Sequence, residues 1–371
     1  MALEKAGYAA FREEQERLRA QGRFVGIGIG FELTPEGACI PDSFIGAYDG
    51  ATVRVNPSGE VTVLTGVTSP GSGNETGIAQ IVADELGVRL EDVRVIQGDT
   101  DLCPYGLGNW SSRSTMIGGS ASQAAAREVR EKIVKAASGM LEVAQGDVQC
   151  EGGRIRVKGA PGREMALAEV ARYIYRSSFG PHAVDLEPSL ESTRYFRMGN
   201  ICHTPDELGR INTYPTYPYA AVVAVVEVDP ETGAVKVLRY VAVHDCGVVI
   251  NPLLVEAQYH GGVAQGIGGV LYEQLSYDEN GQLLTGTFMD YTLPTATEVP
   301  AMEVYHQETP SPFNPLGVKG AGESGITGPL GAVVGAVEDA LSPLGVKIRE
   351  TPLTPNRVWR LIQEAKGRMR K

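Results

Sequence analysis

A single acidic residue, Glu323, stands in a glycine-rich run at residues 317–325. Glycine at 317, 320, 322 and 325 lets the backbone approach another group closely. A helix is predicted to begin just after Thr327, with Pro329 in its first turn. Such a loop directs backbone N–H groups toward an anion, either a phosphate or a metal oxo or thio group. Apolar neighbours are expected to raise the pKa of Glu323 and make it a usable general base. The competing interpretation is a flexible surface loop with an incidental acid.

A second candidate segment lies between a predicted strand at 93–97 and a predicted helix at about 120–138. Its chemically active residues are Ser111, Ser112, Arg113 and Ser114. Hydroxyl groups and a guanidinium just before a helix suit a phosphate or a nucleotide base. The competing interpretation is a loop whose side chains only cap the structure.

A third segment, Gly71-Ser72-Gly73, precedes a predicted helix at about 76–86. Small residues at a helix N-terminus leave its N–H groups accessible to an anion. Taken alone, the segment is equally consistent with a plain N-terminal cap.

The fourth segment is a predicted helix at about 252–272 and the loop before it, which contains Cys246. Gln265 lies on a stripe of small residues that includes Gly262 and Gly266, so it could donate a hydrogen bond to a ligand. Packing against another helix is the alternative explanation for the stripe. We include Cys246 and Gln265 among the candidate cofactor contacts and assign no metal-ligating residue.

Four glycine-rich segments that each open onto a helix are unusual in one chain. They predict a large anionic ligand that is contacted from several sides, mainly by the main chain. Neither GxxxxGK[ST] nor GxGxxG followed by the expected acid is present, so the common nucleotide-binding loops are excluded.

The elements that must position these loops form a repeated pattern. A hairpin at 51–65, with its turn at Asn56-Pro57-Ser58-Gly59, is followed by a glycine-rich loop and a helix. A hairpin at 220–243 is followed in the same way. We therefore expect an α+β fold of two related hairpin–loop–helix subdomains, although hairpins with such turns are also common by chance.

The expected division of the chain has three parts. Residues 1–22 form an amphipathic N-terminal helix, residues 23–215 form the first subdomain, and residues 216–371 form the second. The run 180–214 is rich in proline and is expected to be an irregular segment that joins the two subdomains. Two helices, at about 329–341 and 355–366, are expected to close the chain.

Composition and charge argue against several classes of protein. The 371 residues carry a net charge of -12, which argues against a nucleic-acid partner. The five cysteines are widely spaced without a CxxC pair, which argues against a disulfide framework, a zinc site or an iron–sulfur site. The start of the chain is charged and no run of about 18 apolar residues follows. We expect a protein without a membrane span that works in the cytoplasm.

The chain resembles the xanthine dehydrogenase and carbon monoxide dehydrogenase family of molybdenum hydroxylases. The motifs that carry the resemblance are, in order, GDTD…GLGNWSSRS, DCGVVINP…EAQYHGGVAQGIG, FMDYTLPTA and GVKGAGESG. Together they cover nearly the whole chain, but they match only the second cofactor-binding domain of the large subunit. The first half of that subunit is expected to be a separate polypeptide, because Met1 falls at the boundary between the two halves.

The resemblance implies a molybdenum–molybdopterin cofactor, in the cytosine dinucleotide form, within the aldehyde oxidase and xanthine dehydrogenase type of domain. It also implies partners: the subunit with the first half, an iron–sulfur subunit and an FAD subunit. Glu323 is implied to be the catalytic base, with Gly322 beside the metal. Gln265 and the segment 111–114 would hold the pterin and its nucleotide tail, and the segment 71–73 would approach the pterin or the pyrophosphate.

The chain departs from the family pattern in two segments. Members commonly have Gly-Gln-Gly-His-Glu-Thr where this chain has Gly71-Ser72-Gly73-Asn74-Glu75-Thr76. A shorter hydroxyl therefore replaces an amide at Ser72. Trp110 is bulky where small residues are common, which alters the expected position of the nucleotide tail.

The implied activity is hydroxylation of an aldehyde, a purine or another N-heteroaromatic compound with oxygen derived from water. A reductive aryl-CoA dehydroxylase subunit is the alternative within the family. A non-catalytic cofactor carrier or assembly subunit is the alternative outside enzymes, and such a carrier would not need an acid at position 323. The substrate itself cannot be inferred, because fold does not fix function.

Overall fold

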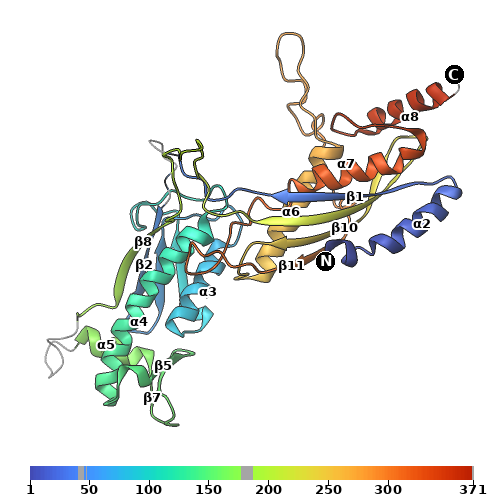
Figure 1. Ribbon diagram of the computed structural model, residues 1–371. Helices are drawn as coiled ribbons and strands as arrows, with labels where there is room; N and C mark the ends of the chain where they lie inside the picture. Colours follow the sequence, from blue (N-terminus) through green and yellow to red (C-terminus); the bar gives the residue numbers. More distant parts are fainter. Residues whose placement is uncertain (41–45, 47, 177–186, 370–371) are drawn as a thin grey trace.

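The computed structural model describes residues 1–40, 46, 48–176 and 187–369, and it contains two α+β units. The first unit comprises strands β2 (Tyr48–Val55), β3 (Val61–Thr65), β4 (Val93–Gln97) and β8 (Glu191–Arg197), and helices α3 (Asn74–Leu86) and α4 (Ser120–Leu141). The second comprises strands β1 (Phe24–Leu33), β9 (Tyr219–Val228), β10 (Val235–Asp245) and β11 (Met302–His306), and helices α1 (Ala2–Lys5), α2 (Tyr8–Ala20), α6 (Pro252–Leu271), α7 (Gly328–Ala340) and α8 (Pro355–Met369). Figure 1 shows the two units next to each other.

The two units share one topology. Each is built on a four-stranded sheet, in the order β8-β2-β3-β4 or β1-β9-β10-β11. An antiparallel hairpin, β2–β3 or β9–β10, is followed by a helix and then by a strand parallel to the second hairpin strand. A helix must intervene because parallel neighbours need a long crossover. A second helix, α4 or α7, packs on each sheet. The expected α+β fold of two related subdomains is confirmed.

Both hairpins turn at the predicted residues. Gly59 donates its N–H to the carbonyl of Asn56 at 2.8 Å, and Gly233 donates to the carbonyl of Asp229 at 2.8 Å. The φ angles of the two glycines are 90° and 76°. This left-handed conformation is accessible to glycine at little cost, so the chain reverses where glycine stands.

The predicted division of the chain is wrong for strand β1, which was assigned to the first subdomain. It pairs with β9, with Phe24 opposite Val228 and Leu33 opposite Tyr219, and so belongs to the second unit. Its glycines let α7 lie directly on the strand: a Cβ added to Gly28 would be 2.0 Å from a helix carbonyl oxygen. The alternation in sequence identified the strand, but pairing with residues about 200 positions away could not be inferred from it.

Two other predictions need correction. The N-terminal helix is broken at Gly7, which has a φ of 63° and separates α1 from α2. The run 180–214 is not irregular throughout, since β8 pairs with β2 along the edge of the first sheet. Residues 180–186 of that run lie outside the described part. Short elements missed in the sequence are β5 (Val148–Glu151), β6 (Arg154–Val157) and β7 (Glu164–Ala166), which form a third sheet beside helix α5 (Leu167–Arg176).

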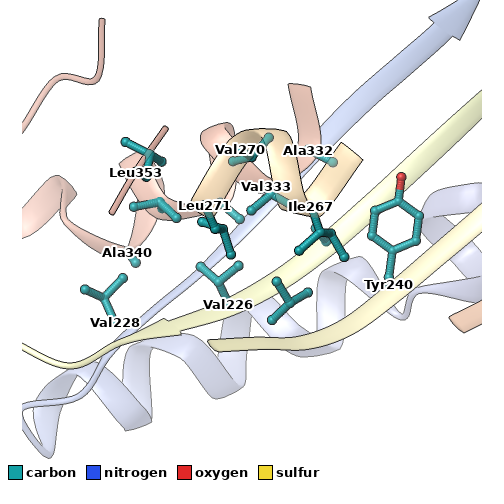
Figure 2. Packing of buried hydrophobic residues seen from close by; sticks show 14 of the residues in the cluster. Val226, Val228, Tyr240, Ile267, Val270, Leu271, Ala332, Val333, Ala340 and Leu353 are labelled. Atoms are coloured by element: carbon teal, nitrogen blue, oxygen red, sulfur yellow. The ribbon is translucent and has the colours of Figure 1, made fainter. Parts of the chain in front are cut away.

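The main core of the second unit lies between its sheet, α6 and α7. Figure 2 shows Val226 and Val228 of the sheet facing Ile267 and Leu271 of α6. The remaining contacts on the α7 side are mostly from alanine and valine, which keep the helix close to the sheet. This rigid layer supports the loops at the ends of the helices.

The segment between α6 and β11 protrudes from the second unit in Figure 1. It carries the FMDYTLPTA motif, and Phe288 and Met289 within it are 86% and 92% exposed. Among the helices that the structure describes, none is long and apolar enough to cross a membrane.

Candidate functional site

A cavity of about 280 Å³ lies where loops of the two units meet. Its walls come from four segments, at 70–77, 109–115, 246–258 and 318–323. The candidate residues that line it are Ser72, Gly73, Ser111, Ser112, Ser114, Cys246, Gly322 and Glu323. Because the units share one topology, the four segments occupy matching positions before α3, α4, α6 and α7. The structure thus brings together loops that are up to about 250 residues apart in sequence.

Glu323 lies at the rim of this cavity and is exposed, so the predicted burial of its carboxyl group is wrong for this chain. Its backbone N–H donates to Ser112 Oγ at 3.1 Å, which joins the loops of the two units. Gly320 sits at the closest approach: an added Cβ would lie 2.7 Å from Ser112 Cβ and 2.8 Å from Glu36 Cβ. Glycine is therefore required at 320 by space.

The N-terminus of α7 binds an internal anion. The N–H groups of Gly325 and Gly328 donate to the two carboxylate oxygens of Glu32, at 2.7 and 3.1 Å. Thr327 occupies the predicted N-cap position but makes no side-chain cap. Burial raises the pKa of Glu32, and the two N–H donors oppose that change. The prediction that these N–H groups face an external ligand is wrong, because a strand residue of the same unit satisfies them.

The N-terminus of α3 has no such internal anion. Gly73 is the N-cap, with a φ of 73° and no side-chain cap. Ser72 lies in the cavity wall, and its buried hydroxyl has no hydrogen-bond partner among the described residues. Asn74 and Gly77 of the first turn also line the cavity. This is the helix end that can accept an external anion. Gly71 is exposed just outside the lining.

The hydroxyl groups of the three serines in segment 111–114 form hydrogen bonds within the protein. Ser111 Oγ accepts hydrogen bonds from the N–H groups of Gly37 and Ala38, each at 3.1 Å. Ser114 Oγ donates to Asn109 at 2.7 Å. The positive φ angles of the first two serines, 47° and 48°, turn the chain sharply toward the second unit. These internal hydrogen bonds support the structural interpretation of this segment, and contact with a phosphate or a nucleotide stays a prediction.

Arg113 is not a cavity residue. Its guanidinium is fully buried in an ion pair with Asp49 at 2.7 Å, and it also donates to the carbonyls of Gly108 and Tyr48. The predicted contact to a nucleotide is therefore wrong, because strand β2 supplies the carboxylate that takes up its charge. Arg113 instead fixes the shape of the loop, and the neighbouring Trp110 lines the cavity with an unpartnered buried ring N–H.

Gln265 also lies outside the cavity, on an exposed part of α6. The glutamine that lines it is Gln258, two turns earlier. The small-residue stripe packs against the loop before α7: a Cβ on Gly262 would lie 2.1 Å from the Ser324 carbonyl oxygen. The packing explanation of the stripe is confirmed, and the ligand contact predicted for Gln265 is wrong.

Cys246 and Lys319 form one edge of the cavity. Burial, and next the nearby Asp245 carboxylate, raise the pKa of the Cys246 thiol to about 12, so the thiol stays protonated. Lys319 Nζ pairs with Asp245 at 2.9 Å, while its N–H donates to the carbonyl of Cys246 at 2.7 Å. Lys319 was missed in the sequence, although it is the cation of the glycine-rich run and could have been singled out for that reason.

Comparison with known families identifies the fold and its ligand. A family model described as a molybdopterin cofactor-binding domain matches residues 1–300. The chain belongs to the molybdopterin cofactor-binding domain family. This domain is 38% identical over 363 residues to the gamma subunit of the 6-hydroxypseudooxynicotine dehydrogenase complex of Paenarthrobacter nicotinovorans, covering 98% of this chain and 43% of that protein. It is 37% identical over 370 residues to the carbon monoxide dehydrogenase large chain of Hydrogenophaga pseudoflava, covering 98% and 44%.

Solved structures give the same result. The molybdopterin cofactor-binding domain superposes on quinoline 2-oxidoreductase from Pseudomonas putida 86 with a TM-score of 0.85 and 38% identity, covering 98% of this chain and 45% of that one. The resemblance stated from the motifs is confirmed. The chain spans less than half the length of the relatives it matches, which agrees with the expected correspondence to a single cofactor-binding domain.

The cavity of this molybdopterin cofactor-binding domain fits the organic part of such a cofactor. Ser72 Oγ and Trp110 Nε1 are buried polar atoms of the lining that have no hydrogen-bond partner in the part of the chain that the structure describes. Buried polar groups are rarely left unpaired, so they indicate a ligand. Beside them, the open end of α3 suits a phosphate group. Within the described residues, no three His, Cys, Asp or Glu side chains form a group that could hold a metal ion.

Proposed function

We propose that this chain is one half of the active site of a molybdenum hydroxylase-type oxidoreductase, with Glu323 as its general base. The observation that carries the proposal is the position of Glu323. It stands at the rim of the cofactor cavity on a loop that Ser112 holds through a backbone hydrogen bond. An exposed carboxylate at that rim can reach a ligand that approaches from outside this chain. A pure carrier of the cofactor has no need for an acid at this place.

The bound cofactor supplies two-electron redox chemistry. Within this chain, Ser72, Gly73 and the open end of α3 are the proposed contacts to the pterin and its phosphate, in place of the glutamine more common in the family. Gly71 would shape this turn. Trp110 and Ser111 would face the nucleotide tail, for which we propose the cytosine dinucleotide form.

Four further contacts complete the proposed cofactor site. The proposed contacts are Ser112, Ser114, Cys246 and Gly322. Gly322 has space for close approach, because an added Cβ would meet only the Ser112 hydroxyl at 3.2 Å and more distant atoms. Arg113 acts indirectly by holding the loop, and Gln265 has no part in this site.

The proposed reaction is oxidation of an aldehyde, a purine or an N-heteroaromatic compound with water-derived oxygen. The names of nicotine 6-hydroxylase, 38% identical to this chain, and of quinoline 2-oxidoreductase favour an N-heteroaromatic substrate. Glu323 would accept the proton released from water during this oxidation, since a carboxylate at hydrogen-bond distance of the reacting oxygen can act as the base.

The proposed complex contains further chains. A polypeptide equivalent to the remaining length of the relatives would close the cavity over Glu323, and an iron–sulfur subunit and an FAD subunit would carry the electrons away. We propose that this complex is cytoplasmic.

The test is to purify the chain with the proteins encoded beside it, to measure molybdenum by elemental analysis, and to assay dye-linked oxidation of N-heteroaromatic compounds. We expect molybdenum in the complex and turnover that falls about 100-fold or more in Glu323→Gln. The matched control is Glu231→Gln, in the exposed β9–β10 turn. A complex without molybdenum and without oxidation would refute the enzyme, while full turnover in Glu323→Gln would refute only the role of the base.

A further inference from the structure

Glu36 is a buried carboxyl group behind the loop that carries Glu323. Its side chain is 0% exposed, and neither carboxylate oxygen has a hydrogen-bond partner among the described residues. Its position is fixed by the backbone that follows it, since Gly37 and Ala38 both donate to Ser111 Oγ. A rigidly placed, unpaired acid in a protein interior is costly, and it usually has a reason beyond packing.

The loop of the second unit passes directly over this acid. Glu36 Cβ would be 2.8 Å from a Cβ on Gly320, and Ser112, which anchors Glu323, lies on the other side of the same glycine. The carboxyl groups of Glu36 and Glu323 are close enough that Glu323 is the strongest charged influence on Glu36. Two segments of the chain that are almost 300 residues apart thus place two acidic side chains close together.

Two ionised carboxylates have only acceptor oxygens, so they repel each other and cannot form a hydrogen bond. One proton between them removes the repulsion and supplies the donor that Glu36 lacks. Burial, followed by the charge of Glu323 and more weakly that of Glu32, raises the pKa of Glu36 to about 8, and the Ser112 hydroxyl opposes this change. At neutral pH Glu36 therefore holds a proton.

We propose that Glu36 is a positioning residue that shares one proton with Glu323 and, by donating a hydrogen bond, orients the Glu323 carboxylate toward the cavity. The hydrogen-bonded pair is a property of this chain alone. The contribution of this pair to catalysis rests on the proposed role of Glu323 as the base. In this pair Glu36 holds the proton in the interior, while the Glu323 carboxyl group stays at the rim of the cavity.

The decisive experiment is infrared spectroscopy of the full chain as a function of pH, in which a protonated buried carboxyl group gives its own absorption band. We expect a band component that is present at neutral pH, disappears near pH 8 and is lost in Glu36→Gln. In Glu323→Gln the component is expected to remain but to titrate at least about one pH unit lower, because the like charge is gone.

Glu231→Gln serves as the control and is expected to leave the titration unchanged. A Glu36 component that titrates at the same pH in the wild type and in Glu323→Gln would overturn the pair. If Glu36→Gln fails to fold, the shift in Glu323→Gln alone decides, since that residue is exposed. This titration needs no cofactor, so its result is independent of whether the chain belongs to an active oxidoreductase.

A second measurement uses the purified complex. Glu36→Gln keeps a donor toward Glu323, whereas Glu36→Ala removes it. We expect kcat to fall at least about tenfold in Glu36→Ala, because the base is no longer held in place, with partial rescue in Glu36→Gln. We also expect Glu36→Gln to lose the change in kcat/KM that accompanies ionisation of the pair near pH 8. Equal kcat and unchanged pH profiles in both variants would show that Glu36 only fills space.

Discussion

The N-termini of α3 and α7 both follow glycine-rich loops and approach one cavity from the two units, yet they end in opposite ways. At α7, the N–H groups of Gly325 and Gly328 are bound by Glu32 from strand β1. At α3, no side chain caps the helix, and the adjacent Ser72 hydroxyl is left without a partner at the cavity wall. Similar local sequences therefore lead to two outcomes: one helix end holds a loop, and the other is the end for which we propose a ligand.

The difference between the two helix ends lies in the side chains of the neighbouring strand. Strand β1 places Glu32 close to the N-terminus of α7, after three glycines that let the helix approach the strand closely. The loop at 317–325 is thus fastened from behind by a buried carboxylate, and its outer face is free to present Glu323. At the α3 end, Ser69 Oγ accepts from the Gly73 N–H, but no buried carboxylate of the described residues binds the first turn, which makes this end the better candidate for a phosphate.

The largest effect is expected from Glu32→Ala. It would leave two buried N–H groups unpaired and lower the free energy of unfolding by about 2–4 kcal/mol, as measured by urea unfolding. Glu75→Ala, in the first turn of α3, is the matched control, and there we expect a change of about 0.5 kcal/mol or less. Equal losses in the two variants would remove the distinction between the helix ends.

Gly320→Ala should have the next largest effect. The added Cβ would lie 2.7 Å from Ser112 Cβ and 2.8 Å from Glu36 Cβ, so the loop must shift. We expect a loss of about 1–3 kcal/mol in the free energy of unfolding and a lower molybdenum content of the purified complex. Gly77→Ala is the counterpart in α3, where the Cβ meets nothing within 4 Å. A loss of stability in Gly77→Ala as large as in Gly320→Ala would contradict the steric argument.

A pH-dependent loss of stability is expected from the interior of the second unit. His244 is fully buried with both ring nitrogens unpartnered among the described residues, and burial, aided by His306, lowers its pKa to about 4. The unfolded chain binds a proton near pH 6.5 but the folded chain does not, so the stability that depends on neutral His244 is lost as pH falls from about 6.5 to about 4. His244→Phe should weaken this dependence in thermal unfolding; an unchanged slope would exclude His244 as its source.

The smallest change in stability is expected for Ser72→Ala. The hydroxyl has no protein partner, so the free energy of unfolding should change by about 0.5 kcal/mol or less. Cofactor retention should fall nonetheless, seen as a lower ratio of molybdenum to protein after dialysis. Ser69→Ala, which removes the acceptor for the Gly73 N–H, provides a comparison in the same turn. Full retention in Ser72→Ala would argue against a cofactor contact at α3.

Most of the fold could be predicted from local patterns. The two hairpin turns, the helices and the existence of two related units follow from alternation, helical periodicity and glycine positions. The strand partner of β1 and strand β8 could not be predicted, because a strand pattern specifies a buried face but not its neighbour. The small sheet β5–β7 was missed because its strands are only three or four residues long.

Only part of the candidate site was predicted correctly, for a similar reason. Loops with glycines, serines and a lone acid were recognised, and the structure brings eight of the eleven candidate residues to one cavity. Arg113 and Gln265 were assigned wrongly, because a charged or amide side chain has several possible partners and the sequence does not show which is nearest. Glu36 and Lys319 went unnoticed for the same reason.

The sequence by itself determined the chemistry that is available: glycine-rich turns before helices, one acid in such a turn, and the motifs of the molybdenum hydroxylases. Only the tertiary structure decided which of these groups pair within the protein and which face the cavity. Glu32 closes one helix end, Asp49 takes up the charge of Arg113, and Glu36 meets Glu323 across almost 300 residues. The physical reason is that electrostatic and hydrogen-bonding roles depend on distance in space, while local sequence patterns carry information about backbone conformation alone.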